Sequence, residues 1–141
     1  MLKDVCIIKN HSPHSHKYIS IINYSKFIDE IHIIESVDKL IEAHQNLPFD
    51  VLMIFVDNSF KSIRELIVLR NFYNDKEIIV LSASNDETFV LKILKSNVSG
   101  FLFLNQNKEN ILHDLSRLRF SKMVFSDNIL KILFNKISNL S

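Results

Sequence analysis

Three observations predict an α/β fold for this chain, a three-layer (βα)5 sandwich with a central parallel sheet of five strands. Short apolar runs alternate five times with segments whose apolar residues recur at helical spacing. The longest run, Val51 to Val56 (VLMIFV), is rich in strand formers and typical of a strand buried on both faces. Strands that alternate with helices imply parallel pairing and right-handed crossovers. The length of 141 residues fits one such domain.

The strands are predicted from the apolar runs and from the residues that close them. Val5 to Ile8 is followed by Asn10, Ser12 and Pro13, which are turn residues. The other predicted strands have the same short apolar character and lie at 31–34, 51–56, 78–81 and 101–104. Ligands of parallel sheets bind beyond the carboxyl ends of the strands, so we expect functional residues just after these runs.

Helices are predicted between the strands from apolar stripes. Ser36 is a good N-cap for a helix that Pro48 ends. The stripe of this helix is Leu40, Ile41, His44 and Leu47. The other predicted helices lie at 17–28, 62–73, 86–94 and 108–118. The stripe of 62–73 is Ile63, Leu66, Ile67 and Arg70. Ser126 is the predicted N-cap of a final helix, whose stripe is Ile129, Leu130, Leu133 and Ile137.

Composition excludes several classes of function. The single glycine, Gly100, rules out P-loops and dinucleotide fingerprints. A formal net charge of +1 argues against a basic nucleic-acid arm and against an acidic tail. The single cysteine, Cys6, lies in an apolar run, which predicts a buried, inert thiol and a reducing, cytoplasmic location. No apolar stretch reaches the ~18 residues of a membrane helix, so we expect no membrane partner.

The stretch from Ile78 to Lys108 carries the strongest family signal (IIVLSASNDETFVLKILKSNVSGFLFLNQNK). A strand ending in Ser82 leads through small and polar residues into a helix, and a strand that begins at Gly100 follows. This pattern resembles the receiver domains of bacterial response regulators, specifically those of the NarL/FixJ (LuxR-type) subfamily. The resemblance continues through residues 122–126 and covers essentially the whole chain. It implies the receiver, or flavodoxin-like, version of the predicted fold.

The resemblance also implies a phosphorylation pocket at the strand ends, and most of its chemistry is missing here. In the family, two acids bind magnesium, an Asp accepts the phosphoryl group, and a Ser or Thr and a Lys contact it. The matching positions are Lys9 and Asn10 for the acids, Phe55 for the acceptor, Ser82 for the Ser/Thr and Leu104 for the Lys. Because magnesium needs oxygen ligands, ideally anionic ones, we expect neither magnesium nor another cofactor.

Asp57 lies two residues beyond Phe55 and would project to the same face of an extended strand. A small register slip could make it an acceptor, but without the magnesium ligands and the Lys nothing stabilises the transition state. Asp57 is otherwise a loop residue or a partner of Lys9, whose ammonium would then stand in the place of the metal. We expect such a pair, if desolvated, to hold the pocket in one state.

Other candidate constellations favour ordinary structural roles. His11, His14 and His16 could suggest a metal site, but no fourth ligand is evident, so solvated loop histidines are favoured. Ser82 has no nucleophile-elbow motif around it and is explained by the resemblance. The basic residues near the end of the fifth predicted helix could contact DNA or acidic groups, although a solvated helix end is favoured. They are Arg117, Arg119 and Lys122.

The end of the chain predicts a receiver-like domain at 1–120 and a linker helix at 121–141. In the resembling subfamily such a helix joins the receiver to a helix-turn-helix domain that commonly opens with Leu-Ser or Leu-Thr. Leu140 and Ser141 stand where that motif would begin. The sequence thus fits a piece of a longer regulator or a natural receiver-only relic, and DNA would be contacted by the absent domain.

We therefore expect a regulatory, non-enzymatic pseudoreceiver of a LuxR-type transcriptional regulator, which acts without aspartyl phosphorylation. It would pair with itself or with another regulator. Family members pair through surfaces that correspond here to 17–28, 89–95 and 111–118. The candidate side chains on the last of these are Ile111, Leu112, Leu115 and Leu118. Phe101 takes the place of the switch aromatic and should point inward, because it lacks a hydroxyl group.

Two other functions stay open from the sequence. Asp57 could be a noncanonical phosphoacceptor. The pocket could instead bind a small neutral ligand, because the loss of charged residues makes it more apolar. Its lining would be Asn10, Phe55, Asp57, Ser82 and Leu104.

Overall fold

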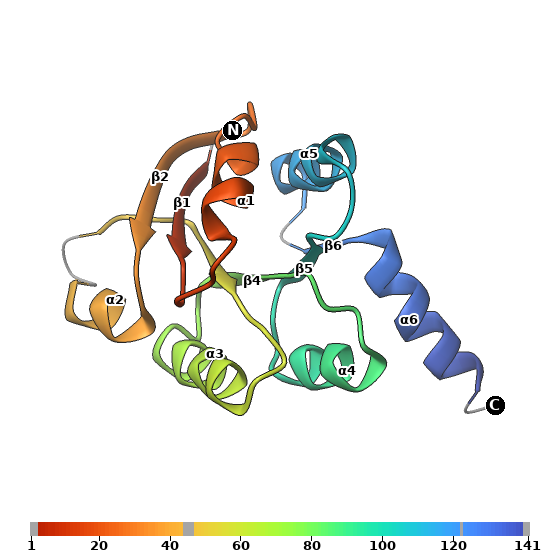
Figure 1. Cartoon of the computed structure of the whole chain (residues 1–141). Helices are drawn as coiled ribbons and strands as arrows, with labels where there is room; N and C mark the ends of the chain where they lie inside the picture. The colour runs from red at the N-terminus through yellow and green to blue at the C-terminus, as the bar shows by residue number, and fades with distance from the viewer. Residues whose placement is uncertain (1–2, 44–46, 122, 140–141) are drawn as a thin grey trace.

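The computed structural model describes residues 3–43, 47–121 and 123–139, and these residues form an alternating α/β chain (Figure 1). His44, Lys122, Leu140 and Ser141, which entered the sequence predictions, lie outside the described residues. The strands are β1 (Lys3–Ile8), β2 (Ile28–Ile34), β3 (Val51–Phe55), β4 (Glu77–Ser82), β5 (Gly100–Phe103) and β6 (Val124–Phe125). The helices are α1 (Ser15–Ile22), α2 (Val37–Ala43), α3 (Phe60–Phe72), α4 (Glu87–Lys95), α5 (Lys108–Ser116), the 3-10 turn η2 (Arg117–Arg119) and α6 (Asp127–Ser138).

The sheet has the strand order β2-β1-β3-β4-β5-β6, and every neighbouring pair is parallel. Helices α1 and α5 cover one face, and α2, α3 and α4 cover the other (Figure 1). The predicted three-layer α/β fold is thereby confirmed. The crossovers bring the carboxyl ends of β1, β3, β4 and β5 to one edge of the sheet, where ligands of such folds bind.

Alternation along the buried strands divides the apolar core into two layers. In β1, Val5 and Ile7 pack under α1 and α5, whereas Cys6 and Ile8 pack under α2, α3 and α4. Both faces of β3 are buried as well, as its continuous apolar sequence predicts. These central strands are rigid supports for the loops that follow them.

The first predicted helix was too long. Helix α1 ends at Ile22, and Asn23 donates its backbone N–H to Ile19 O at 2.9 Å. The chain then turns, and Ile28 already pairs with Lys3 at the start of the edge strand β2. This edge strand has only a partly buried face, so its apolar pattern was too weak to separate it from the helix.

The buried face of α3 differs by about one residue from the apolar stripe predicted for this helix. Leu66 and Leu69 are fully buried, while Ile67 is 46% exposed. Helix α3 therefore presents apolar side chains to solvent as well as to the core.

The tail is more than the predicted linker helix. Val124 and Phe125 form a sixth strand that pairs with Gly100 and Phe101, which corrects the predicted five-stranded sheet. A strand of two residues is too short for its alternation of apolar and polar side chains to be recognised in the sequence. Ile129, in the first turn of α6, is buried in the core, so the segment after residue 120 is joined to the body of the fold. The outer end of α6 projects away from the body of the fold (Figure 1).

Candidate functional site: the pocket at the strand ends

A cavity of about 420 Å³ lies beyond the carboxyl ends of the central strands. Five of the six residues predicted at the phosphorylation site line it, because the loops after β1, β3, β4 and β5 converge there. Its lining is Asn10, Ser12, Pro13, His14, Tyr18, Phe55, Val56, Asp57, Ser62, Leu81, Ser82, Ala83, Ser84 and Leu104. Lys9, which was expected to take the place of the metal, does not line it.

Asn10 ties the first loop to the third strand. Its backbone is in the left-handed region (φ 52°), which Asn tolerates better than most residues. Its Nδ2 donates to Phe55 O at 3.1 Å and to Ser62 Oγ at 3.4 Å. The same Ser62 Oγ accepts from the backbone N–H of Asp57 at 3.0 Å. The Asn10 amide thus joins the loop after β1 to the end of β3 and to α3. In the resembling family, an acidic pair in the loop after β1 holds the metal.

Lys9 does not pair with Asp57, and this corrects the prediction. The Lys9 ammonium lies 3.3 Å from Glu35 Oε1, at the end of the neighbouring strand β2. Asp57 is exposed, and its Oδ1 accepts from the backbone N–H of Ser59 at 2.8 Å. Alternation explains the difference, because Lys9 and Asn10 are consecutive and their side chains diverge.

The floor of the pocket is apolar. Phe55 and Leu104, at the acceptor and lysine positions, are 4% and 3% exposed and pack in the same core layer. Ser82 is also buried, and its Oγ accepts from the backbone N–H of Ser84 at 3.2 Å. No cation of the described residues lies within ion-pair distance of Asp57. The pocket can therefore hold an apolar group but offers no lysine opposite an anion.

Phe101 is fully buried, and its ring meets the ring of Phe89 edge to face, with centroids 5.9 Å apart. The expected inward orientation is the one found. The role of Phe101 as a switch stays a prediction.

The candidate dimer residues on the fifth helix face the core of their own chain. Ile111, Leu115 and Leu118 are at most 1% exposed, and Leu112 is half-buried. These side chains pack against the face of the sheet that α1 and α5 cover. They cannot form the exposed patch that was expected of them.

Two of the remaining candidates depart from the roles that the sequence favoured. Arg117, expected at a solvated helix end, lies 2.6 Å from the Asp114 carboxylate. His16, expected in a loop, lies in the first turn of α1. His11, His14 and His16 are exposed, and no cluster of three metal-ligating side chains occurs in the described ranges. Cys6 is fully buried, and burial raises the pKa of its thiol to about 12, so it is an inert core residue. Within the described part of the chain, no helix is long and apolar enough to cross a membrane.

Sequence reasoning missed a buried polar cluster beside the pocket, which we call the Asp114 cluster (Gln106, Asp114, Arg117 and Ser126). Asp114 is 5% exposed; its Oδ2 accepts from Ser126 Oγ at 2.7 Å and from Gln106 Nε2 at 2.9 Å. Its Oδ1 accepts from Arg117 Nη2 at 2.6 Å. Ser126 Oγ in turn accepts from the backbone N–H of Phe103 at 2.9 Å.

The Asp114 cluster joins three elements. Ser126 precedes α6 as predicted, but its side chain makes no capping bond and is turned inward to Asp114. Arg117 also donates to Phe125 O at 2.9 Å, which adds β6 to the network. Asp114 follows Ile111 by three residues and so falls on the apolar stripe of α5, and Arg117 follows it by three more; this was the available sequence signal.

Comparison with known proteins identifies structures of similar fold. No protein-family model and no curated protein matches the sequence. Among solved structures, the isolated REC domain of RcsB from Salmonella enterica serovar Typhimurium, with phosphomimetic BeF3−, is similar. Its TM-score is 0.76 at 15% identity, with 94% of this chain and 99% of that chain covered.

Two further structures agree with this likeness. A two-component response regulator of the LuxR family from an Aurantimonas species has a TM-score of 0.79 at 10% identity, over 98% of this chain and 99% of that one. RcsB bound to a promoter has a TM-score of 0.78 at 17% identity, over 99% of this chain and 69% of that one. At these identities the likeness is one of architecture, and this chain has the receiver-domain fold.

Proposed function

We propose that this chain is a regulatory, non-enzymatic receiver-like domain that acts without aspartyl phosphorylation, as a degenerate member of the LuxR-type regulators. The observation that carries the proposal is the burial of Phe55 at the acceptor position. Its side chain is 4% exposed and packs in the same core layer as Leu104. A buried phenyl ring cannot accept a phosphoryl group. The neighbouring groups add support, since Lys9 is bound to Glu35 and Asn10 to the backbone of Phe55.

Phosphoryl transfer requires charge neutralisation at the transferring group. In this pocket a neutral amide occupies one magnesium-ligand position, and the leucine at the lysine position offers no donor. The pocket therefore favours a fixed conformation that a partner, rather than a phosphoryl group, would control.

NMR titration with millimolar magnesium and beryllofluoride tests this proposal. We expect no saturable shifts at Asn10, Phe55 or Asp57. A variant that restores missing groups within the pocket, Asn10→Asp/Phe55→Asp/Leu104→Lys, is the matched control and should gain such shifts. A saturable response of the unaltered protein at these residues would contradict the proposal.

Self-association without phosphorylation is part of the proposal, on a surface other than the one first expected. The apolar side chains of α5 are buried, whereas Phe134 and Ile137 on α6 are 62% and 54% exposed. Exposed apolar side chains on one helix are suited to association. Analytical ultracentrifugation should detect a dimer at micromolar concentrations. If only monomer is found up to ~100 μM, a second regulator is favoured as the partner. A dissociation constant near that concentration corresponds to a binding free energy of only ~5–6 kcal/mol.

A transcriptional output is proposed from the resemblance to LuxR-type regulators. It would act on DNA through a helix-turn-helix domain that this sequence does not contain. A LuxR-type neighbour of similar fold is described as bound to a promoter. The cytoplasmic location that such a regulator would have is proposed on the same grounds.

Two alternatives remain for the pocket. Phosphorylation of Asp57 is disfavoured because no cation of the described residues lies within ion-pair distance of its carboxylate, and its Oδ1 already accepts from the Ser59 backbone. Binding of a small neutral ligand is favoured by the cavity of about 420 Å³ with Phe55 and Leu104 in its wall. A thermal-shift screen of neutral compounds tests it, and a true ligand should lose its effect in Leu104→Lys.

A further inference from the structure

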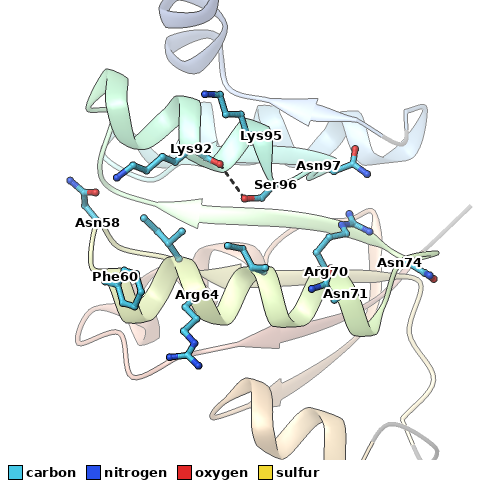
Figure 2. A pocket seen from close by; sticks show the side chains of 12 residues that line it. Asn58, Phe60, Arg64, Arg70, Asn71, Asn74, Lys92, Lys95, Ser96 and Asn97 are labelled. Carbon is cyan, nitrogen blue, oxygen red and sulfur yellow. Dashed lines mark hydrogen bonds between the residues drawn. The ribbon is translucent and has the colours of Figure 1, made fainter.

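A second and larger cavity, of about 1260 Å³, lies between α3 and α4, away from the strand-end pocket. Figure 2 shows it from close by: Arg70 rises from α3 toward the gap, and Lys92 extends toward the end marked by Asn58 and Phe60. Arg64 extends from α3 on the side away from α4. Its volume exceeds the roughly 300–1,000 Å³ of small-molecule sites, so the cavity is suited to a chain segment. We call it the α3–α4 groove.

All the charged side chains of the α3–α4 groove are cations. Arg64, Arg70, Lys92 and Lys95 line it, and no acid does. None of these four cations has a carboxylate within ion-pair distance among residues 3–43, 47–121 and 123–139. The whole chain has a net charge of only +1, so its positive charge is concentrated at this groove. The groove therefore attracts an anionic partner.

Apolar side chains lie among these cations. Phe60 is 81% exposed and Ile67 is 46% exposed, and Ile63 is half-buried beside them. Burying such surface is favourable, by roughly 25 cal/mol per Å². Among the residues that line the groove, Phe60 alone has a ring on which a nucleic-acid base could stack, and the aliphatic Ile63 and Ile67 extend the apolar strip without adding a second platform. A phosphate-rich ligand would leave this apolar surface unused.

Arg70 adds a fixed donor at one end of the groove. Its Nη1 donates to Tyr73 O at 3.1 Å and to Lys76 O at 3.0 Å, while its Nε is buried without a partner. Burial lowers the pKa of this guanidinium, which remains charged at neutral pH. The groove thus combines an apolar strip, three freely exposed cations and one positioned cation.

We propose that the α3–α4 groove docks an acidic, amphipathic segment of a partner protein. The apolar side chains of the segment would cover Phe60, Ile63 and Ile67. Its carboxylates would meet Lys92 along the groove and Arg64 and Lys95 at the outer sides of the groove. This is the helix-in-groove mode of recognition, in which apolar anchors give affinity and flanking charges give orientation. It is independent of whether the strand-end pocket can be phosphorylated.

The probe is a synthetic helical peptide of about 15 residues with Leu at positions i, i+3, i+4 and i+7 and Glu on both flanks. Fluorescence anisotropy should give saturable binding that weakens with salt, and NMR shifts should be confined to α3 and α4. A peptide with Lys in place of Glu should bind at least about tenfold more weakly. A single-stranded DNA of similar charge should also bind more weakly than the Glu peptide.

Three variants separate the groove from general electrostatics. Arg64→Glu/Lys92→Glu should weaken the Glu peptide at least about tenfold, since both side chains are exposed and neither supports the core. Ile67→Asn, which keeps the charge, should weaken it about threefold or more. Lys26→Glu/Lys131→Glu makes the same charge change at exposed positions outside the groove and should leave affinity unchanged.

The proposal is overturned by any of four results: no saturable binding at millimolar peptide, tighter binding of the DNA, NMR shifts centred outside α3 and α4, or equal losses in the groove and control variants. Insensitivity to Ile67→Asn would also overturn it, because binding would then be electrostatic alone. Circular dichroism of each variant must match the parent, and a variant that fails is replaced by Lys92→Gln/Lys95→Gln.

Discussion

The strand-end pocket and the Asp114 cluster differ in how their charged groups are satisfied. In the cluster, a buried carboxylate accepts bonds from three side chains on separate segments. In the pocket, Asp57 is bound to the backbone of Ser59 and the floor is apolar, while Lys9 lies outside the pocket and pairs with Glu35. Polar interactions therefore fasten the C-terminal helix here, while the pocket keeps no arrangement for phosphate chemistry.

Removal of the Asp114 carboxylate should have the largest effect on stability. Asp114→Ala removes the acceptor that Ser126, Gln106 and Arg117 share. Arg117 is partly exposed and keeps its bond to Phe125 O, so the loss comes mainly from the buried donors left unsatisfied, which lowers the free energy of unfolding by about 3 kcal/mol. Urea denaturation measures it. Asp57→Ala, at the exposed carboxylate of the pocket, should change it by less than about 1 kcal/mol. Equal losses in the two variants would remove the contrast between the regions.

Gly100→Ala should detach the sixth strand. A Cβ at this position would collide with the backbone carbonyl of Val124, which cannot move without breaking the β5–β6 pairing. Overpacking of this kind lowers the free energy of unfolding by about 1–3 kcal/mol.

Hydrogen exchange locates the effect of Gly100→Ala. The amides of Val124 and Ser126, which donate to Ser99 O and Phe101 O, should exchange faster. Ser99→Ala, one residue earlier, is the control. Unchanged protection of these amides in Gly100→Ala would show that β6 does not depend on the close approach.

Asn10 should matter less than Asp114. Asn10→Ala removes the bonds to Phe55 O and Ser62 Oγ, worth about 1 kcal/mol net, and places alanine at φ 52°, which costs about 1 kcal/mol more. Asn10→Gly removes the bonds without the backbone strain, so it should be the milder variant in thermal unfolding. If the glycine variant were the less stable, the left-handed backbone would not be the source of the strain.

The fold followed from the sequence because the central strands are buried on both faces and read as continuous apolar runs. Edge elements did not: β2 was shortened and β6 was missed, since an edge strand buries little and two residues show no period. At the pocket, alignment with the resembling family placed Asn10, Phe55, Ser82 and Leu104 together. It could not place Lys9, because side-chain direction after a strand depends on a neighbour, Glu35, that is 26 residues away.

The Asp114 cluster was beyond sequence reasoning for a related reason. Its members come from the loop after β5, from α5, from the turn that follows it and from the residue before α6. Each is an ordinary surface residue in its own segment, and only the tertiary arrangement buries them together. Ser126 illustrates this, because a serine before a helix predicts a capping bond that here is replaced by the contact with Asp114.

Phosphoryl transfer itself tests the central claim most directly. The full chain is incubated with magnesium and a small acyl phosphate donor, and its intact mass is followed by mass spectrometry beside the variant Asn10→Asp/Phe55→Asp/Leu104→Lys. The unaltered chain should gain no phosphoryl group, because Phe55 cannot accept one and no cation faces Asp57. A phosphoryl adduct on the unaltered chain that disappears in Asp57→Ala would contradict the account.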